Sequence, residues 1–190
     1  TNIDREHLDH YAGLAEIQDA FTVFVNKVPF YGAAVLCLDD PSVQAILPRV
    51  ERRIISYGTS NQADLVASRI EYQNFGCSYQ IRWHGESLGA LSLQVPGQHG
   101  VLNSLAAVAI GLELNIAAEK IIAALSSFQN ADRRFQIKGE SRGVLVVDDY
   151  GHHPTEIMAT LSAARSSTDR RIVAVFQPHR YSRTRALEEE

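Results

Sequence analysis

Residues 144–176 read VLVVDDYGHHPTEIMATLSAARSSTDRRIVAVF, and this stretch decides the expected fold. Two uninterrupted apolar runs, 144–147 and 172–176, enclose a segment with helical spacing that starts at Pro154. Proline is common at the first position of a helix. Continuous apolar runs on both sides of a helix are typical of a parallel sheet that is covered on both faces. The stretch therefore predicts a right-handed strand–helix–strand unit.

The residues upstream predict a mixed sheet with helices. Helices are expected from apolar spacing over about 11–26, 42–50, 101–112 and 117–128, and buried strands over 33–38 and 53–57. Within 65–95, short β-prone segments alternate with turn residues, so we expect an antiparallel meander there. Because the pattern changes near 130–136, we place a domain boundary there and expect domains over 1–130 and 131–190.

Composition narrows the class of protein. The chain has 190 residues, is 45% hydrophobic and 21% charged, and carries a net charge of −4, which excludes a disordered chain. It lacks the basic excess that attracts nucleic acid, and no apolar run approaches the roughly 20 residues of a membrane span. The two cysteines, Cys37 and Cys77, have no CxxC spacing and are expected to be core thiols of a cytosolic protein.

Both ends of the chain are unusual. It begins at Thr1 without a methionine, and it ends at Glu190 just after the start of a predicted helix. We therefore expect a piece of a longer protein. We also expect that uncovered apolar strands such as 172–176 favour self-association.

Two polar clusters follow the two apolar runs of the opening stretch. The first spans 148–154 (DDYGHHP) and the second spans 177–185 (QPHRYSRTR). Ligands of open parallel sheets bind outside the carboxyl ends of the strands, so both clusters are expected at one functional edge. Arginine side chains suit phosphate and carboxylate, and a helix N-terminus offers N–H groups to an anion. The structural alternative is that the carboxylates shape a turn and that His153 only caps the helix.

Two further clusters are weaker by themselves. Residues 6–9 (EHLD) combine carboxylate and imidazole groups, which suit a divalent metal, although such clusters are common at helix starts. Residues 97–103 (GQHGVLN) form a glycine-flanked loop that opens a helix, where Asn103 on the first turn has a donor and an acceptor for an adenine edge. A P-loop, GxxxxGK[ST], is absent, and none of Lys27, Lys120 and Lys138 lies in a glycine loop.

Taken together, these strings are specific. In chain order they are TNIDREHLDHY, GQHGVLNSLAA, RRFQIKG, DDYGHHPTE and FQPHRYSRTR. Through them nearly the whole chain resembles the Mur ligase family, and most closely its alanine-adding branch. The resemblance implies an α/β fold: the remainder of a central ATPase domain, with a mixed sheet and a small antiparallel meander, followed by the start of a Rossmann-like parallel domain.

The resemblance also implies roles for individual residues. By position, His7 matches a metal-binding histidine, and the resemblance implies Mg²⁺ and ATP as cofactors. The residues that match nucleotide-binding positions are His99, Asn103, Arg134 and Asp149. The residues that match positions facing the amino acid and the acyl phosphate are His152, Arg180 and Arg183. One departure is Gly100: the family usually has HNxxN here, so one amide is missing and Asn103 is the main candidate for adenine.

The activity implied by the resemblance is an ATP-dependent ligation. ATP would phosphorylate the carboxylate of UDP-N-acetylmuramic acid, and the amine of L-alanine would displace the phosphate. Because the P-loop lysine is absent, we expect this 190-residue piece to be inactive alone. Two alternatives stay open: a ligase of the same family that recycles a murein tripeptide, and a non-catalytic nucleotide-binding or scaffold module.

Overall fold

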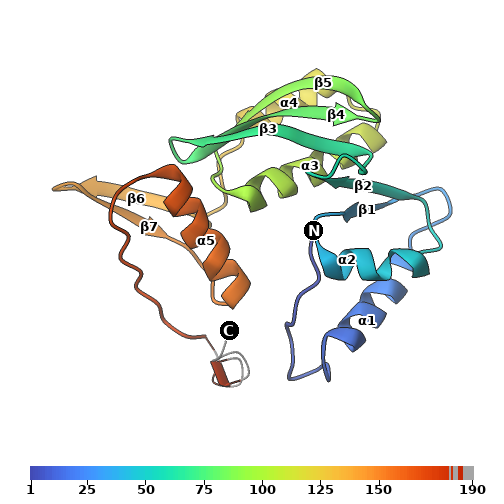
Figure 1. The fold of residues 1–190 in the computed structure, drawn as a ribbon, viewed down its shortest axis with the longest axis horizontal. Coiled ribbons are helices and arrows are strands. Elements are labelled where there is room, and N and C mark those ends of the chain that lie inside the picture. Colours follow the sequence, from blue (N-terminus) through green and yellow to red (C-terminus); the bar gives the residue numbers. More distant parts are fainter. Residues whose placement is uncertain (180, 182–183, 186–190) are drawn as a thin grey trace.

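The computed structural model describes residues 1–179, 181 and 184–185. Figure 1 shows a large sheet flanked by helices and a smaller C-terminal part beside it. This arrangement confirms the predicted mixed α/β fold. Among the described residues, no helix is both long enough and apolar enough to cross a membrane.

The large sheet has the order β1-β2-β3-β4-β5. Its strands are β1 (Ala34–Cys37), β2 (Ile54–Gly58), β3 (Leu65–Gln73), β4 (Gly76–Trp83) and β5 (Glu86–Leu93). β1, β2 and β3 run parallel, whereas β3, β4 and β5 form the predicted antiparallel meander.

Helices cover the sheet on both faces. One layer contains α1 (Leu14–Asn26) and α2 (Pro41–Ile46), which is followed by the short helix η1 (Leu47–Arg49); the other contains α3 (Gln98–Glu113) and α4 (Ala118–Ser126). Alternate residues of β1 pack against different helix layers, because successive side chains of a strand point to opposite faces. Ala34 and Leu36 pack with the first layer, and Cys37 packs in the core with α3 and α4.

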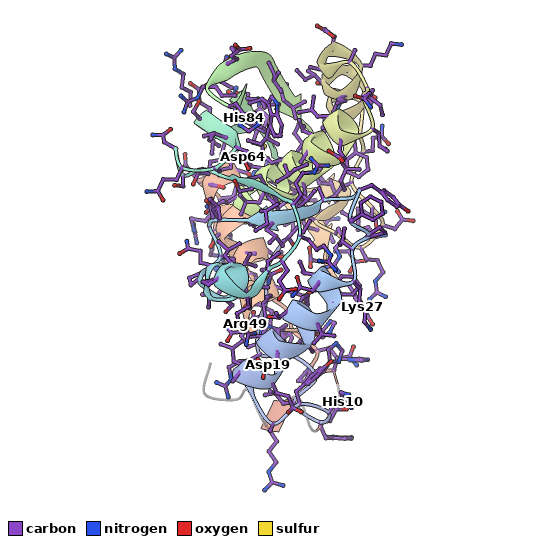
Figure 2. The ribbon with its side chains drawn as sticks, turned by 90° about the vertical axis from the view of Figure 1, so that its right-hand side faces the viewer. His10, Asp19, Lys27, Arg49, Asp64 and His84 are labelled. Carbon is purple, nitrogen blue, oxygen red and sulfur yellow. The ribbon has the colours of Figure 1, made fainter. Side chains whose placement is uncertain are left out.

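Polar contacts fix the layer of α1 and α2. Asp40 caps α2 by accepting a hydrogen bond from the backbone N–H of Val43 at 2.7 Å, and Pro41 follows at the first helical position. Arg49, at the end of η1, donates to Asp19 of α1 at 2.6 Å, and both residues are labelled in Figure 2. This pair holds the end of η1 against α1.

The C-terminal part contains β6 (Gln136–Ser141), β7 (Val144–Asp148) and α5 (Pro154–Ser167). β6 and β7 form an antiparallel pair. The sequence did not predict β6, because its side chains are mostly polar and exposed. α5 reaches the central part through Ala163, which is fully buried.

The predicted strand over 172–176 is wrong. These residues have no strand assignment, and the side chains of Val173 and Val175 are 69% and 96% exposed. A strand needs a hydrogen-bonded neighbour, and within the described part of the chain none pairs with this segment. The predicted strand–helix–strand unit is therefore present only as β7 and α5.

Candidate functional site

The loop between β7 and α5 is organised by Asp149. Its Oδ2 accepts a hydrogen bond from the backbone N–H of Phe135 at 2.8 Å, and its Oδ1 accepts one from Gly151 at 2.7 Å. A Cβ atom at Gly151 would lie 2.9 Å from Oδ1, so a side chain there would force the loop to shift. Each carboxylate oxygen retains a further lone pair, so Asp149 is able to accept another hydrogen bond from a ligand hydroxyl.

The N-terminus of α5 is already occupied by a carboxylate of the same helix. Glu156 Oε2 accepts hydrogen bonds from the backbone N–H groups of His152 at 3.1 Å and His153 at 3.3 Å. Burial raises the pKa of Glu156, but these two bonds and the guanidinium of Arg134 outweigh it and hold the pKa below its ordinary value. The expectation of free N–H groups for an anionic ligand at this helix start is therefore corrected for these two residues.

His152 lies in a group of rings close to the helix start. Its side chain is 16% exposed, and Nδ1 lies 2.8 Å from the carbonyl oxygen of Tyr150. Because a carbonyl only accepts, Nδ1 carries a proton in this contact, so that in the neutral ring the lone pair belongs to Nε2. The rings of Tyr150 and His179 lie 5.1 and 5.2 Å from that of His152, and the guanidinium of Arg133 stacks 4.5 Å from the centroid of the Tyr150 ring.

Three of the predicted nucleotide-binding residues converge, although they belong to different elements. His99 lies in the first turn of α3, Arg134 precedes β6 and Asp149 follows β7. Burial lowers the pKa of His99; the carboxylate of Asp149 opposes this shift, and the guanidinium of Arg134 adds to it. Burial therefore favours the neutral form of the His99 imidazole, while the charges of Asp149 and Arg134 act on it in opposite senses.

Close packing between α3 and α5 accounts for this convergence. A Cβ atom at Gly97, which directly precedes α3, would lie 2.7 Å from the Cβ of Ala163 in α5. Gly97 also has a φ of +82°, which side chains rarely adopt. Glycine at this position therefore lets the N-terminus of α3 approach α5.

Asn103 is exposed on α3, and one detail of its prediction is wrong. The helix begins at Gln98, so Asn103 lies on the second turn and not on the first. Helical periodicity located the apolar stripe that starts at Val101, but it did not reveal the turn formed before it. The structure gives no contact between Asn103 and the three converging residues.

The described residues do not form a metal site by themselves. His7 is exposed and has a φ of 55°, and its carbonyl oxygen accepts hydrogen bonds from His10 and Tyr11. In the described part of the chain, no three His, Cys, Asp or Glu side chains are grouped as a metal would require. His7 therefore fits Mg²⁺ only as one ligand of a set that these residues do not complete.

Two of the predicted site arginines, Arg180 and Arg183, lie outside the described residues.

Two polar residues of this region were not predicted from the sequence. Sequence reasoning missed the central role of Glu156, although a glutamate three residues after the cap is a known signature of a helix start. It also missed Asp4, whose Oδ2 accepts a hydrogen bond from the hydroxyl of Thr155. No local pattern could reveal a contact between residues 151 positions apart.

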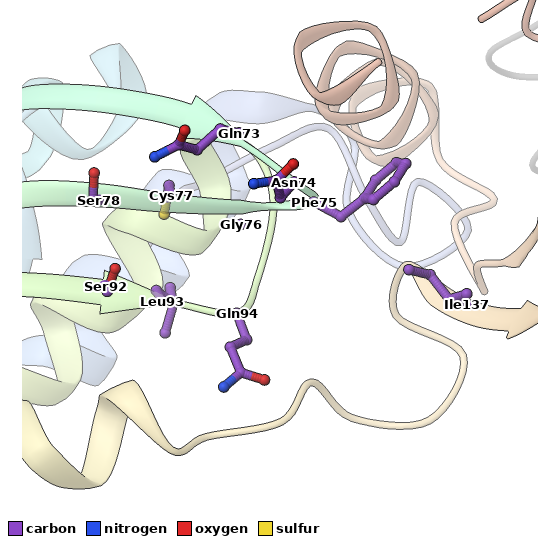
Figure 3. Close-up of a pocket in the computed structure, with 10 residues that line it drawn as sticks. All are labelled: Gln73, Asn74, Phe75, Gly76, Cys77, Ser78, Ser92, Leu93, Gln94 and Ile137. Carbon is purple, nitrogen blue, oxygen red and sulfur yellow. The ribbon is translucent and has the colours of Figure 1, made fainter.

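A separate surface pocket of about 500 Å³ lies at the tip of the β3–β4 hairpin. Figure 3 shows Gln94 below the hairpin tip and Ile137 of β6 to its right, and both residues line the pocket. None of the predicted site residues lines this pocket. It is therefore distinct from the group formed by His99, Arg134 and Asp149.

Family models match both parts of the chain. The model described as the Mur ligase middle domain matches residues 1–111, and the model described as the Mur ligase glutamate ligase domain matches residues 133–190.

Individual relatives point in the same direction. A protein of Syntrophotalea carbinolica named UDP-N-acetylmuramate–L-alanine ligase is 56% identical over the whole chain, which spans 42% of that relative's length. Among solved structures, MurF of Acinetobacter baumannii has a TM-score of 0.79 at 26% identity, over 88% of this chain and 36% of that one. The UDP-N-acetylmuramate–alanine ligase MurC of Thermotoga maritima has a TM-score of 0.75 at 26% identity, over 96% of this chain and 41% of that one.

Proposed function

The chain belongs to the Mur ligase family, and from this premise we propose that its intact protein joins L-alanine to UDP-N-acetylmuramic acid with ATP. The observation that carries this proposal is the 56% identity over all 190 residues to a relative that bears this activity in its name. The chain spans about two fifths of such relatives, so the activity is assigned to the intact protein.

In the proposed reaction, a carboxylate oxygen of the sugar attacks the γ-phosphorus of ATP, and ADP leaves. The amine of L-alanine then attacks the acyl carbon, and the tetrahedral intermediate expels inorganic phosphate as the amide forms. Catalysis of such steps depends on positioning and on stabilisation of negative charge. The residues of this chain contribute mainly to positioning.

We assign nucleotide binding to His99, Asn103, Arg134 and Asp149. The lone pairs that Asp149 retains suit the hydroxyls of a ribose, and the guanidinium of Arg134 suits a phosphate oxygen. The imidazole of His99 has a flat ring that suits packing against a base, and burial favours its neutral form. Asn103 is assigned to the adenine edge on the basis of its amide and its family position.

We assign contacts with the amino acid and the acyl phosphate to His152, Arg180 and Arg183. The Nε2 lone pair of His152 suits acceptance of the proton that the amine loses as the amide forms. The two guanidinium groups suit the carboxylate of L-alanine and the phosphate.

Mg²⁺ would neutralise phosphate oxygens in such a reaction. We propose His7 as one of its ligands, and we derive no step through the metal because the described residues do not complete a site. The boundary between the two domains is proposed near 130–136, where the turn that contains Arg134 leads into β6.

The test is phosphate release by the intact protein with ATP, UDP-N-acetylmuramic acid and either L-alanine or a murein tripeptide. We expect release that depends on L-alanine. Release only with the tripeptide would assign the recycling activity instead. A protein that releases no phosphate with either substrate would refute the ligase assignment and favour a scaffold module.

A further inference from the structure

The segment before α1 is anchored to the central part at its start. Ile3 is 5% exposed and packs with α1 and α2, and its backbone N–H lies 3.4 Å from Oδ1 of Asp40, the residue that caps α2. The next residues of this segment therefore project from a fixed point on the central part.

The same segment is bound to α5 of the C-terminal part. Nε2 of His153 lies 3.1 Å from the carbonyl oxygen of Arg5, and the Thr155 hydroxyl donates to Asp4. These contacts join residues that are 148 and 151 positions apart. Residues 3–5 therefore connect the starts of two helices that belong to different parts of the chain.

His153 has a partner for each ring nitrogen. Nδ1 lies 3.4 Å from the backbone N–H of Thr155 and accepts from it as the cap of α5. Nε2 then carries the proton and donates to Arg5, because a carbonyl oxygen only accepts. The ring is 3% exposed, so water does not readily replace either partner.

The contact between His153 and Arg5 affects the nucleotide site because His153 lies close to Asp149 in the β7–α5 loop. Only three residues separate His153 from Asp149. Another link between α5 and the central part is the close approach of Gly97 to Ala163, which lies more than two turns further along α5. Separated links of this kind oppose a pivot of α5, and loss of the His153–Arg5 contact would weaken the hold on the loop, with the Thr155–Asp4 hydrogen bond remaining at this end.

We propose that His153 is a positioning residue that holds the β7–α5 loop on the segment of residues 3–5, so that Asp149 and Arg134 face His99 when nucleotide binds. The inference rests on the proposed function, since it deepens the assignment of the nucleotide site. His153 itself touches no reacting atom in this account.

The decisive variant is His153→Asn. Asparagine is among the best helix caps, so it keeps the hydrogen bond with Thr155, but its shorter side chain does not reach the carbonyl of Arg5. His153→Ala removes both contacts and serves as the comparison. His84→Asn is the matched control, because His84 lies in the β4–β5 turn at the opposite end of the molecule from His10 (Figure 2). Its φ of 48° is one that asparagine tolerates.

Two measurements on the intact protein test the proposal. Amide hydrogen exchange should accelerate in residues 3–11 of His153→Asn but stay unchanged within α5. The KM for ATP should rise about fivefold, as expected for the loss of one hydrogen bond, while kcat stays within about twofold. His84→Asn should match the wild type in both measurements.

If His153 acted only as a helix cap, the opposite result would be expected: His153→Asn would behave like the wild type, whereas His153→Ala would not. The proposal is overturned if His153→Asn leaves either the exchange of residues 3–11 or the KM for ATP unchanged. If the wild-type protein ligates no substrate, the proposed function fails, and the exchange of residues 3–11 together with the dissociation constant for ATP then decides the role of His153.

Discussion

Replacement of Asp149 by asparagine tests how the β7–α5 loop is held. Two backbone N–H groups, of Phe135 and Gly151, donate to the two oxygens of this carboxylate at 2.8 and 2.7 Å. Asparagine has one oxygen and one NH₂ group, so it can accept from only one of them and must turn a donor toward the other. At least one of the two amides loses its partner.

The magnitude follows from the type of bond that is lost. A hydrogen bond to a charged group contributes about 1.5–3 kcal/mol, so we expect the free energy of local opening of the loop to fall by about 2 kcal/mol. Since about 1.4 kcal/mol corresponds to a factor of ten, at least one of the two amides should exchange roughly 30-fold faster with solvent. Native-state hydrogen exchange followed by NMR measures this directly and does not require the whole protein to unfold in two states.

The neighbouring Asp148 provides the matched control. Its carboxylate lies 3.9 Å from Nε of Arg133, and both side chains are substantially exposed. Such surface pairs contribute about 0–1 kcal/mol, so Asp148→Asn should change exchange at Phe135 and Gly151 by no more than about fivefold. Equal exchange in the two variants, or wild-type exchange in Asp149→Asn, would refute the account of the loop.

The same Asp149→Asn variant also tests how the charge of Asp149 affects the pKa of His99. The pKa of this imidazole is below its ordinary value because of burial, and the negative charge of Asp149 opposes that shift. Removal of the charge should therefore lower the pKa of His99 further. An NMR titration of the ring protons measures it, and an unchanged or higher pKa would show that the two residues do not interact.

Three other predictions concern packing, pH and activity. Gly97→Ala should destabilise the protein more than Gly143→Ala in thermal unfolding, because both glycines have positive φ but only Gly97 has a neighbour, Ala163, within 4 Å of the added carbon. The pKa of Glu156 is lowered in the folded state, so its stabilising contribution should persist above the ordinary value of 4.5 and disappear as the pH falls through the lower, folded value. Glu156→Gln should remove this part of the pH dependence in denaturant titrations, and an unaltered slope would contradict it. The 190-residue chain alone should release no phosphate from ATP, since it lacks a P-loop lysine, and measurable ligation by it would contradict the assigned roles.

Much of the candidate site could be predicted from motifs. The string DDYGHHPTE placed Asp149 and His152 between a strand and a helix, and the structure finds them there. The turn before α3 was harder to predict, because Gln98 and His99 have no apolar periodicity and the helix begins earlier than its apolar stripe. Arg180 and Arg183 remain predictions from the motif alone.

Features that depend on near neighbours could be read from the amino-acid sequence. Apolar period and turn residues predicted the meander of β3, β4 and β5, and the proline at position 154 predicted the start of α5. These signals are local because backbone hydrogen bonds, caps and hairpin turns involve residues only a few positions apart. They are therefore present in the sequence before any tertiary contact forms.

Which of these elements have partners depends on long-range contacts that form in the folded protein. The run 172–176 has the composition of a strand, yet it is irregular and mostly exposed because no described strand pairs with it. Conversely, the polar segment of β6 pairs with β7, and His153 reaches Arg5 across 148 residues. A strand or a long-range contact gains its stability from a surface that folding brings together, and no window of the sequence contains both sides of that surface.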